Sequence, residues 1–250
     1  MPMHLALFSA SQGPSATLQK LAALQTEFEN VSNNAFVVGA LGQVIGAFGY
    51  GASLLRVQFQ EPVLQSPFFP DLVPVVESLP SASVPSPWVD LSANPLVLKP
   101  TEQFSCYTTS GGTVAAQQVV GVLFADKAPT PAPGKNRTMR ATGATTLTAY
   151  EWSPTIITLD ESLPAGTYTV VGMVAQSAGA IAARIGVPGQ AYRPGGPAVN
   201  NEQFRVDPHF RNGGLGAWFS FVNTDQLTVD FFSATADTAE VVYLDLVGPT

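Results

Sequence analysis

Residues 167–175 read TYTVVGMVA, a run in which apolar side chains fall on both faces of an extended chain. Successive side chains of a strand point to opposite faces, so Val171 and Met173 would alternate with apolar neighbours on the other side. Strands that are covered on both faces show this continuous apolar pattern. The preceding LPAGTY places Pro164 and Gly166 where a turn needs a fixed or a positive φ. The stretch therefore predicts a central strand that begins directly after a turn.

Similar short runs follow one another through the rest of the chain after Pro100. They are EQFSCY, QQVVGVLF, TTLTAYEW, TIITL, AIAARIGV, AWFSFV, QLTVDFF and AEVVYLDLV. Turn signals separate them, among them the Asn-Gly pair at Asn212 and Gly213, and no helical pattern intervenes. Runs of this length and spacing indicate an all-β sandwich or barrel.

The first part of the chain has a different pattern. Leu18, Leu21 and Phe28 fall at helical spacing, and Ala, Leu, Gln and Glu dominate around them. Ser15 is a suitable N-cap residue for a helix that begins there. We therefore expect an N-terminal helix over residues 15–30.

Residues 62–100 contain nine of the 21 prolines of the chain. Proline cannot donate a hydrogen bond to a sheet ladder and breaks a helix interior, so this backbone should be extended and irregular. The segment is too apolar to remain solvated. We expect it to form an arm that lies across another surface.

Residues 35–55, AFVVGALGQVIGAFGYGASLL, carry no charge and contain five glycines. The length suits a membrane-spanning helix, but each glycine costs a helix interior about 1 kcal/mol relative to alanine. We expect strand structure buried between subunits, with a membrane span as the lesser alternative. The candidate subunit-interface residues in this segment and in the arm are Phe36, Val38, Leu41, Ile45, Phe48, Phe68, Phe69 and Trp88.

The composition points to association and away from nucleic acid. The chain is 46% hydrophobic and 12% charged, with a net charge of −7, whereas charged residues make up about 25% of an ordinary domain. Interface cores are depleted in charge, and a nucleic-acid binder would be basic. The one candidate basic loop contains Lys127, Lys135, Arg137 and Arg140; a solvated loop is the favoured interpretation, and a site for phosphates or lipid headgroups is the alternative.

Few residues are suited to catalysis. His209 is flanked by Arg205, Asp207 and Arg211, a candidate polar cluster that favours a loop of ion pairs over a general base or pH switch. His4 lies in a terminus that we expect to be mobile. Two carboxylate pairs, Asp160 with Glu161 before a Pro-Gly turn and Asp225 with Asp230, are interpreted as solvated residues rather than a calcium or glycosidase pair; Asp230 falls on the wet face of the strand QLTVDFF.

No motif for chemistry or export was found in the sequence. Cys106 is the single cysteine, so no intrachain disulfide is expected and folding in a reducing cytoplasm is indicated. The sequence contains no zinc set, nucleophile elbow or nucleotide-binding glycine pattern, and its start lacks the basic region of a secretory signal. We therefore expect no enzyme activity, no cofactor, no metal and no small-molecule substrate.

The pattern TYTVVGM, AIAARI, YRPGG, FRNGGLGAWFSF and YLDLV resembles the jelly-roll major capsid proteins of tailless icosahedral viruses, and also uncharacterised proteins of small environmental phage genomes. The resemblance covers mainly residues 159–247 and part of 54–74. It implies an all-β jelly-roll sandwich that stands on a shell, often as a trimer, with arms that tie neighbours together.

From these observations we assign residues 1–100 to an N-terminal helix, apolar segment and arm, and 101–250 to one jelly roll. A compact double jelly roll, with a degenerate first roll over residues 35–100, is the alternative. Some members of the family carry two fused rolls.

The expected function is a self-assembling capsid protein located in the virion and assembled in the host cytoplasm. Its partners would be copies of itself, as a trimer or a shell lattice, and other virion proteins; contact with an internal membrane or genome is a weaker expectation. The alternative is a carbohydrate- or receptor-binding β-sandwich of a spike or fibre, which exposed Trp88, Trp152, Trp218 or Tyr192 beside carboxylates would support.

Overall fold

The computed structural model describes residues 1–24, 31–32, 34–51, 54–61, 75–76, 88–111, 113–199 and 210–249. Within these ranges the chain is all-β, and no α-helix occurs. No helix in this described part is long and apolar enough to cross a membrane. The chain divides into two compact units: unit 1 comprises Met1–His4, Leu79–Ser86 and Pro129–Thr250, and unit 2 comprises Leu5–Ser78 and Pro87–Ala128.

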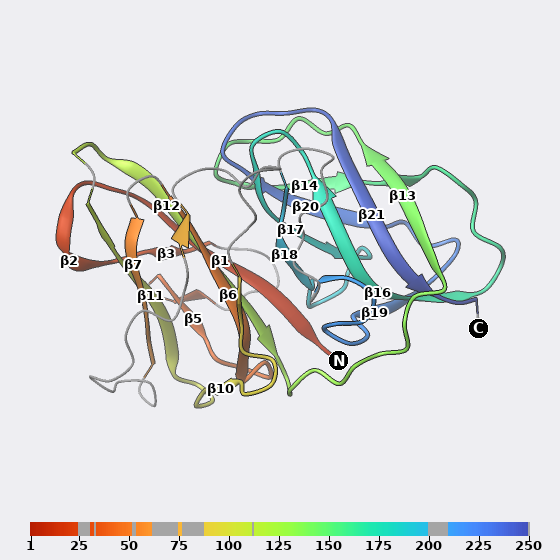
Figure 1. Ribbon diagram of the computed structural model, residues 1–250, viewed down its shortest axis with the longest axis horizontal. Helices are drawn as coiled ribbons and strands as arrows, with labels where there is room; N and C mark the ends of the chain where they lie inside the picture. The colour runs from red at the N-terminus through yellow and green to blue at the C-terminus, as the bar shows by residue number, and fades with distance from the viewer. Residues whose placement is uncertain are drawn as a thin grey trace. The chain divides into compact units, whose positions relative to one another are not determined.

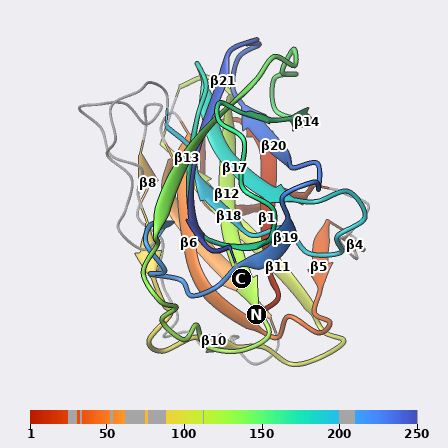
Figure 2. The ribbon, with the colours of Figure 1, turned by 90° about the vertical axis from the view of Figure 1, so that its right-hand side faces the viewer.

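Among its described residues, unit 1 contains nine strands in two antiparallel sheets. Figures 1 and 2 show these sheets in green to blue. The first sheet has the order β15-β13-β21-β16-β19 and the second the order β14-β20-β17-β18. The strands are β13 (Arg137–Gly143), β14 (Trp152–Ile156), β15 (Thr158–Leu159), β16 (Thr167–Gln176), β17 (Ala180–Gly186), β18 (Gly195–Pro197), β19 (Phe219–Val222), β20 (Thr228–Ser233) and β21 (Glu240–Val247).

The strand order of unit 1 matches a jelly roll. Without the two-residue β15, the other eight strands can be numbered one to eight along the chain. The two sheets then run 1-8-3-6 and 2-7-4-5. In this arrangement each sheet takes strands from the start and the end of the unit, as in two interlocked Greek keys.

Unit 2 has its own two sheets. Its strands are β1 (Met3–Gln12), β2 (Ser15–Lys20), β3 (Ala22–Ala23), β4 (Val31–Ser32), β5 (Ala35–Val37), β6 (Gln43–Gly51), β7 (Leu54–Gln60), β8 (Val75–Val76), β9 (Val89–Asp90), β10 (Leu96–Val97), β11 (Gln103–Ser110) and β12 (Ala116–Ala125). The first two residues of β1 fall in unit 1. One sheet contains β10-β6-β12-β1-β3, with β8 and β9 also paired to β6, and the other contains β2-β11-β5-β4, with β7 paired to β11.

The long strands of unit 2 repeat the order of unit 1. β1, β12 and β6 lie side by side and correspond to positions 1-8-3, while β2, β11 and β7 correspond to positions 2-7-4. β9 and β10 pair with β6, as the sixth strand does with the third in unit 1. The chain therefore contains the jelly-roll order once in full and once in large part.

Two expectations differ from these observations. Residues 15–20 and 22–23 form strands where a helix was expected, because β2 pairs with β11 and β3 pairs with β1; residues 25–30 lie outside the described part. The units divide near residue 128 rather than at 100, because β11 and β12 pair with β7 and β6.

The strand predicted for TYTVVGMVA and the two turns predicted at Gly166 and at Asn212–Gly213 are present. β16 lies between β21 and β19, so TYTVVGMVA is a central strand. Gly166 has a φ of 147°, and its backbone N–H donates to Asn223. Asn212 and Gly213 have φ values of 51° and 80°, the paired positive values that favour Asn-Gly in a tight turn.

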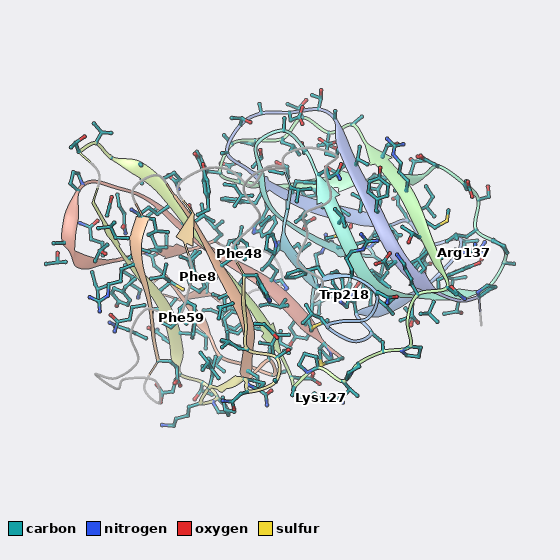
Figure 3. All side chains as sticks on the ribbon, viewed as in Figure 1. Phe8, Phe48, Phe59, Lys127, Arg137 and Trp218 are labelled. Atoms are coloured by element: carbon teal, nitrogen blue, oxygen red, sulfur yellow. The ribbon has the colours of Figure 1, made fainter. Side chains whose placement is uncertain are left out.

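Aromatic rings fill the space between the sheets of unit 2. Phe104 packs against Phe8 and Phe124 at centroid distances of 5.9 and 5.2 Å. Figure 3 shows Phe8, Phe48 and Phe59 among the strands of this unit. Cys106 is buried here, and burial raises the pKa of its thiol well above the usual value.

Candidate functional site

The expected interface residues of the apolar segment are in the core of unit 2. Phe36, Val38, Leu41, Ile45 and Phe48 are all buried. They lie on or beside β5 and β6, and the ring of Phe36 stacks on Phe124 at 4.6 Å. Their apolar character is therefore used within the chain, and these five side chains are not available to a neighbouring subunit.

Gly46 of this segment and Gly121 of β12 each leave room for an aromatic ring. A side chain at Gly46 would collide with the indole ring of Trp88, and one at Gly121 on β12 would collide with the ring of Phe48. Trp88 is half-buried. Phe68 and Phe69, the expected interface residues of the arm, lie outside the described residues.

Of the expected polar cluster, the structure describes one member. Arg205, Asp207 and His209 lie outside the described residues. Arg211 makes two hydrogen bonds to Asp245 of β21, with donor–acceptor distances of 2.6 and 2.9 Å. An ion pair at Arg211 was expected, but its partner Asp245 was not identified from the sequence.

The expected basic loop is only partly a loop, because Arg137 and Arg140 lie on strand β13. Lys127 is exposed and belongs to unit 2, whereas the other three residues belong to unit 1 (Figure 3 labels Lys127 and Arg137). Lys135 binds Asp245 at 3.0 Å, the guanidinium of Arg137 lies 5.8 Å from the ring centre of Tyr168, and Arg140 binds Asp160 at 2.6 Å. These three charges have partners within the unit, which weakens the phosphate or headgroup alternative.

Asp245 is the centre of a polar cluster on unit 1. Its carboxylate is buried and accepts hydrogen bonds from Arg211, from the Lys135 ammonium, from the Thr138 hydroxyl at 2.9 Å and from the backbone N–H of Asn212 at 3.0 Å. Burial alone would raise the pKa of Asp245, but these donors lower it to about 2. The carboxylate therefore holds the loops that contain Lys135 and Asn212 against β21.

A second buried cluster was missed in the sequence. Asp230 of β20 binds Arg184 of β17 at 2.9 Å and Arg193 at 2.6 Å. The Arg184 guanidinium also stacks on the ring of Trp152 at 4.1 Å. Asp230 was expected to be solvated, on the wet face of the strand QLTVDFF; it does lie on a strand but is buried, because β20 pairs with both β14 and β17.

His4 belongs to this second cluster. Its Nδ1 accepts the backbone N–H of Arg193 at 3.1 Å, and its Nε2 lies 3.3 Å from a guanidinium nitrogen of Arg184. The terminus that contains His4 was expected to be mobile, but the His4 side chain is buried. No sequence signal could indicate this group, since its members are separated by up to 226 positions along the chain, from residue 4 to residue 230.

The aromatic residues named for carbohydrate binding have other contacts. Trp218 is 3% exposed, Trp152 stacks on Arg184, and Tyr192 packs edge-on against His4 at 6.4 Å. Trp88 covers Gly46. These four rings therefore pack against the protein and do not form the exposed platform that was considered.

No protein-family model and no curated protein matches the chain. Among solved structures, the chain is similar to the major capsid protein P2 from bacteriophage PM2. The match covers 98% of each chain, with a TM-score of 0.28 and 10% sequence identity. At that score the likeness assigns neither a fold nor a function.

Proposed function

We propose that this chain is a viral structural protein, a capsid protein that assembles with copies of itself into a shell. The observation that carries the proposal is the strand order 1-8-3-6 and 2-7-4-5 of unit 1, repeated as 1-8-3 and 2-7-4 in unit 2. Jelly rolls serve in viral capsids and also in lectins and cupins. Three copies of a chain with two similar units would supply six similar building blocks to a trimer.

The low charge of the chain supports the same function. Only 12% of the residues are charged, and interface cores are depleted in charge. Four large apolar side chains are exposed on described strands at sheet edges: Leu55 on β7, Val97 on β10, Ile156 on β14 and Val222 on β19. A sheet edge with unpaired backbone groups is a template for pairing with another chain. We place the subunit contacts at these edges instead of at the buried side chains of residues 35–55.

In this role the chain acts without catalysis, cofactor or small-molecule substrate. Its main partners are copies of itself, and its location is the virion. Contacts with other virion proteins, and assembly in the host cytoplasm, belong to the same proposal.

The test is the assembly state of the purified full chain. Light scattering after size-exclusion chromatography should show trimers or larger species, and negative-stain microscopy should show blocks or closed shells. A monomer at every protein and salt concentration would overturn the proposal.

A further inference from the structure

Unit 1 carries a pocket of about 420 Å³ between the segment that follows β14 and the loop that joins β19 to β20. Ligand pockets span about 300–1,000 Å³, so this one is large enough for a small ligand. Its lining includes Ile157, Glu161, Leu163, Phe221, Asp225 and Leu227. From the sequence, Glu161 and Asp225 were placed in two different carboxylate pairs, and their position at one pocket was not expected.

The floor of the pocket is apolar. Four of the lining side chains are each at most 8% exposed: Ile157, Leu163, Phe221 and Leu227. The backbone N–H of Ile157 donates to the Leu227 carbonyl at 3.1 Å, which ties the two sides of the floor together. Removing apolar surface from water is favourable. The floor therefore favours a ligand that has methylene groups.

The rim of the pocket carries two exposed carboxylates, Glu161 and Asp225. Glu161 makes no hydrogen bond or ion pair within the part of the chain that the structure describes. Asp225 accepts the backbone N–H of Val222 at 2.7 Å, which orients the carboxylate without neutralising its charge. No lysine or arginine is among the described residues that line the pocket. Strand β13 pairs with β15 beside the pocket, but its Arg140 is bound to Asp160 at 2.6 Å and does not offset these charges.

The loop that contains Asp225 is held in place by backbone hydrogen bonds. The N–H of Asp225 donates to the Val222 carbonyl at 2.8 Å, which closes a turn. Asn223 donates its N–H to the Gly166 carbonyl at 3.1 Å, and its side-chain oxygen accepts the Gly166 N–H at 3.2 Å. This side of the rim is therefore ordered before any ligand arrives, which reduces the entropic cost of binding.

An apolar floor below an acidic rim selects for an aliphatic cation. An ammonium group donates three hydrogen bonds and carries a positive charge, and its methylene stem can lie on apolar surface while the charged head stays in water. A carboxylate or phosphate ligand would be repelled by the two acidic residues, and a neutral alcohol would form no ion pair. We propose that this pocket binds a primary alkylammonium ion, supplied by a free aliphatic amine or by the lysine side chain of a neighbouring protein.

The test measures binding by the intact full-length chain at pH 7 and low ionic strength, with n-pentylamine as the probe. Saturation-transfer NMR should detect the bound amine, and titration should give its dissociation constant. Methylamine lacks the stem and 1-pentanol lacks the charge, so each should bind about fivefold or more weakly. Pentanoate, with the opposite charge, should not bind. Nα-acetyl-lysine methylamide distinguishes the two sources, because it binds only if the pocket accepts the ammonium group of a protein side chain.

Substitutions at the rim test the two carboxylates. Glu161→Gln and Asp225→Asn should each raise the dissociation constant of pentylamine about two- to fivefold, as expected for an exposed ion pair, and the double variant should bind more weakly than either. Glu151→Gln removes an exposed carboxylate of the same unit outside the pocket and should leave the constant unchanged. Circular dichroism and the melting temperature confirm that each variant is folded.

Three results would overturn the inference: pentylamine does not bind at millimolar concentration, 1-pentanol binds as well as pentylamine, or the double variant binds like the wild type. Light scattering of the same samples gives the assembly state. Shells that do not bind the amine would contradict this inference alone, and a monomer that binds it would contradict only the proposed capsid function.

Discussion

At the scale of single residues, Asp245 is a buried charge whose ion pairs contribute to stability. Its buried carboxylate forms ion pairs with Arg211 and Lys135, and both of these side chains are only partly exposed. Removing one partner of a buried ion pair leaves the other charges uncompensated. We expect Asp245→Asn to lower the free energy of unfolding by about 2–4 kcal/mol, as measured by urea denaturation. Asp225→Asn, at an exposed turn, is the matched control and should have less than half of this effect.

The same carboxylate predicts an acid-sensitive stability. The pKa of Asp245 is lowered from 3.8 to about 2 in the folded chain, so folding favours its ionised form. That contribution is present above the unfolded-state pKa and is lost as the pH falls from about 4 to about 2. A shift of this size corresponds to about 2 kcal/mol. Urea midpoints between pH 5 and pH 2 should fall more steeply for the wild type than for Asp245→Asn; parallel curves would contradict the assignment.

Glu240 predicts the opposite dependence. Its carboxyl is buried, one oxygen accepts the Thr145 N–H at 3.2 Å, and the other has no hydrogen-bond partner among the described residues. Burial raises its pKa, so the charged form is disfavoured in the folded chain. Glu240→Gln should therefore raise the free energy of unfolding at pH 7, and the gain should disappear below about pH 4, where the acid is protonated in both states. A gain that persists at pH 3.5 would mean that desolvation of the charge is not its cause.

The composition showed that titratable side chains are scarce. It did not show which of these side chains contact one another in the fold. The ion pair at Arg211 was expected because charged residues lie near it in the sequence. Asp230 and His4 could not be assigned, since their partners are brought together by pairing between strands far apart in the chain. A polar residue can be buried only where it has hydrogen-bond or ion-pair partners. For Asp230 and His4 these partners are distant in the sequence, so the neighbouring residues do not predict the burial.

At the scale of elements, alternation and turn chemistry identified most of the strands after Pro100, but the expected strand TTLTAYEW is irregular up to Glu151, and β13 lies in a stretch that was interpreted as a loop. β16 and the Asn212–Gly213 turn follow from residue order alone, because both depend on local geometry. The expected helix over residues 15–30 is absent from its described part because β2 and β3 obtain their backbone partners from β11 and β1. Helix propensity is weak compared with such tertiary pairing.

Close packing of β12 against Phe48 yields a prediction for the elements of unit 2. A Cβ at Gly121 would overlap the ring of Phe48, and Phe48 is only 1% exposed. Gly121→Ala should therefore destabilise the chain by about 1–3 kcal/mol. Gly13 has no atom within 4 Å of the position that its Cβ would occupy, so Gly13→Ala is the matched control and should be neutral or slightly stabilising. Equal melting temperatures for the two variants would show that the core adapts to the added methyl group.

At the scale of the whole molecule, the low charge of the composition indicated association between subunits. The apolar pattern of the sequence did not indicate which surface makes the contact. Residues 35–55 were expected to be buried by another subunit, whereas the interface residues named there, Phe36, Val38, Leu41, Ile45 and Phe48, are buried within unit 2. A continuous apolar run is typical both of a core strand and of an obligate interface, because the two environments are chemically alike. Only the positions of the pairing strands distinguish them, and these are set by contacts across the chain.

Subunit contacts at sheet edges can be tested by one charge on an edge strand. Val222 ends β19, is 44% exposed, and its backbone N–H is satisfied by Asp225 at 2.7 Å. Val222→Lys keeps this backbone bond and adds a charge that would have to be desolvated in an interface. We expect the concentration at which the assembly dissociates to rise about tenfold or more, which corresponds to about 1.4 kcal/mol. Ala236→Lys adds the same charge at an exposed loop position of unit 1 and should leave assembly unchanged. If both variants assemble like the wild type, β19 is not a contact strand, and if both are impaired equally, the effect is one of net charge and not of this edge.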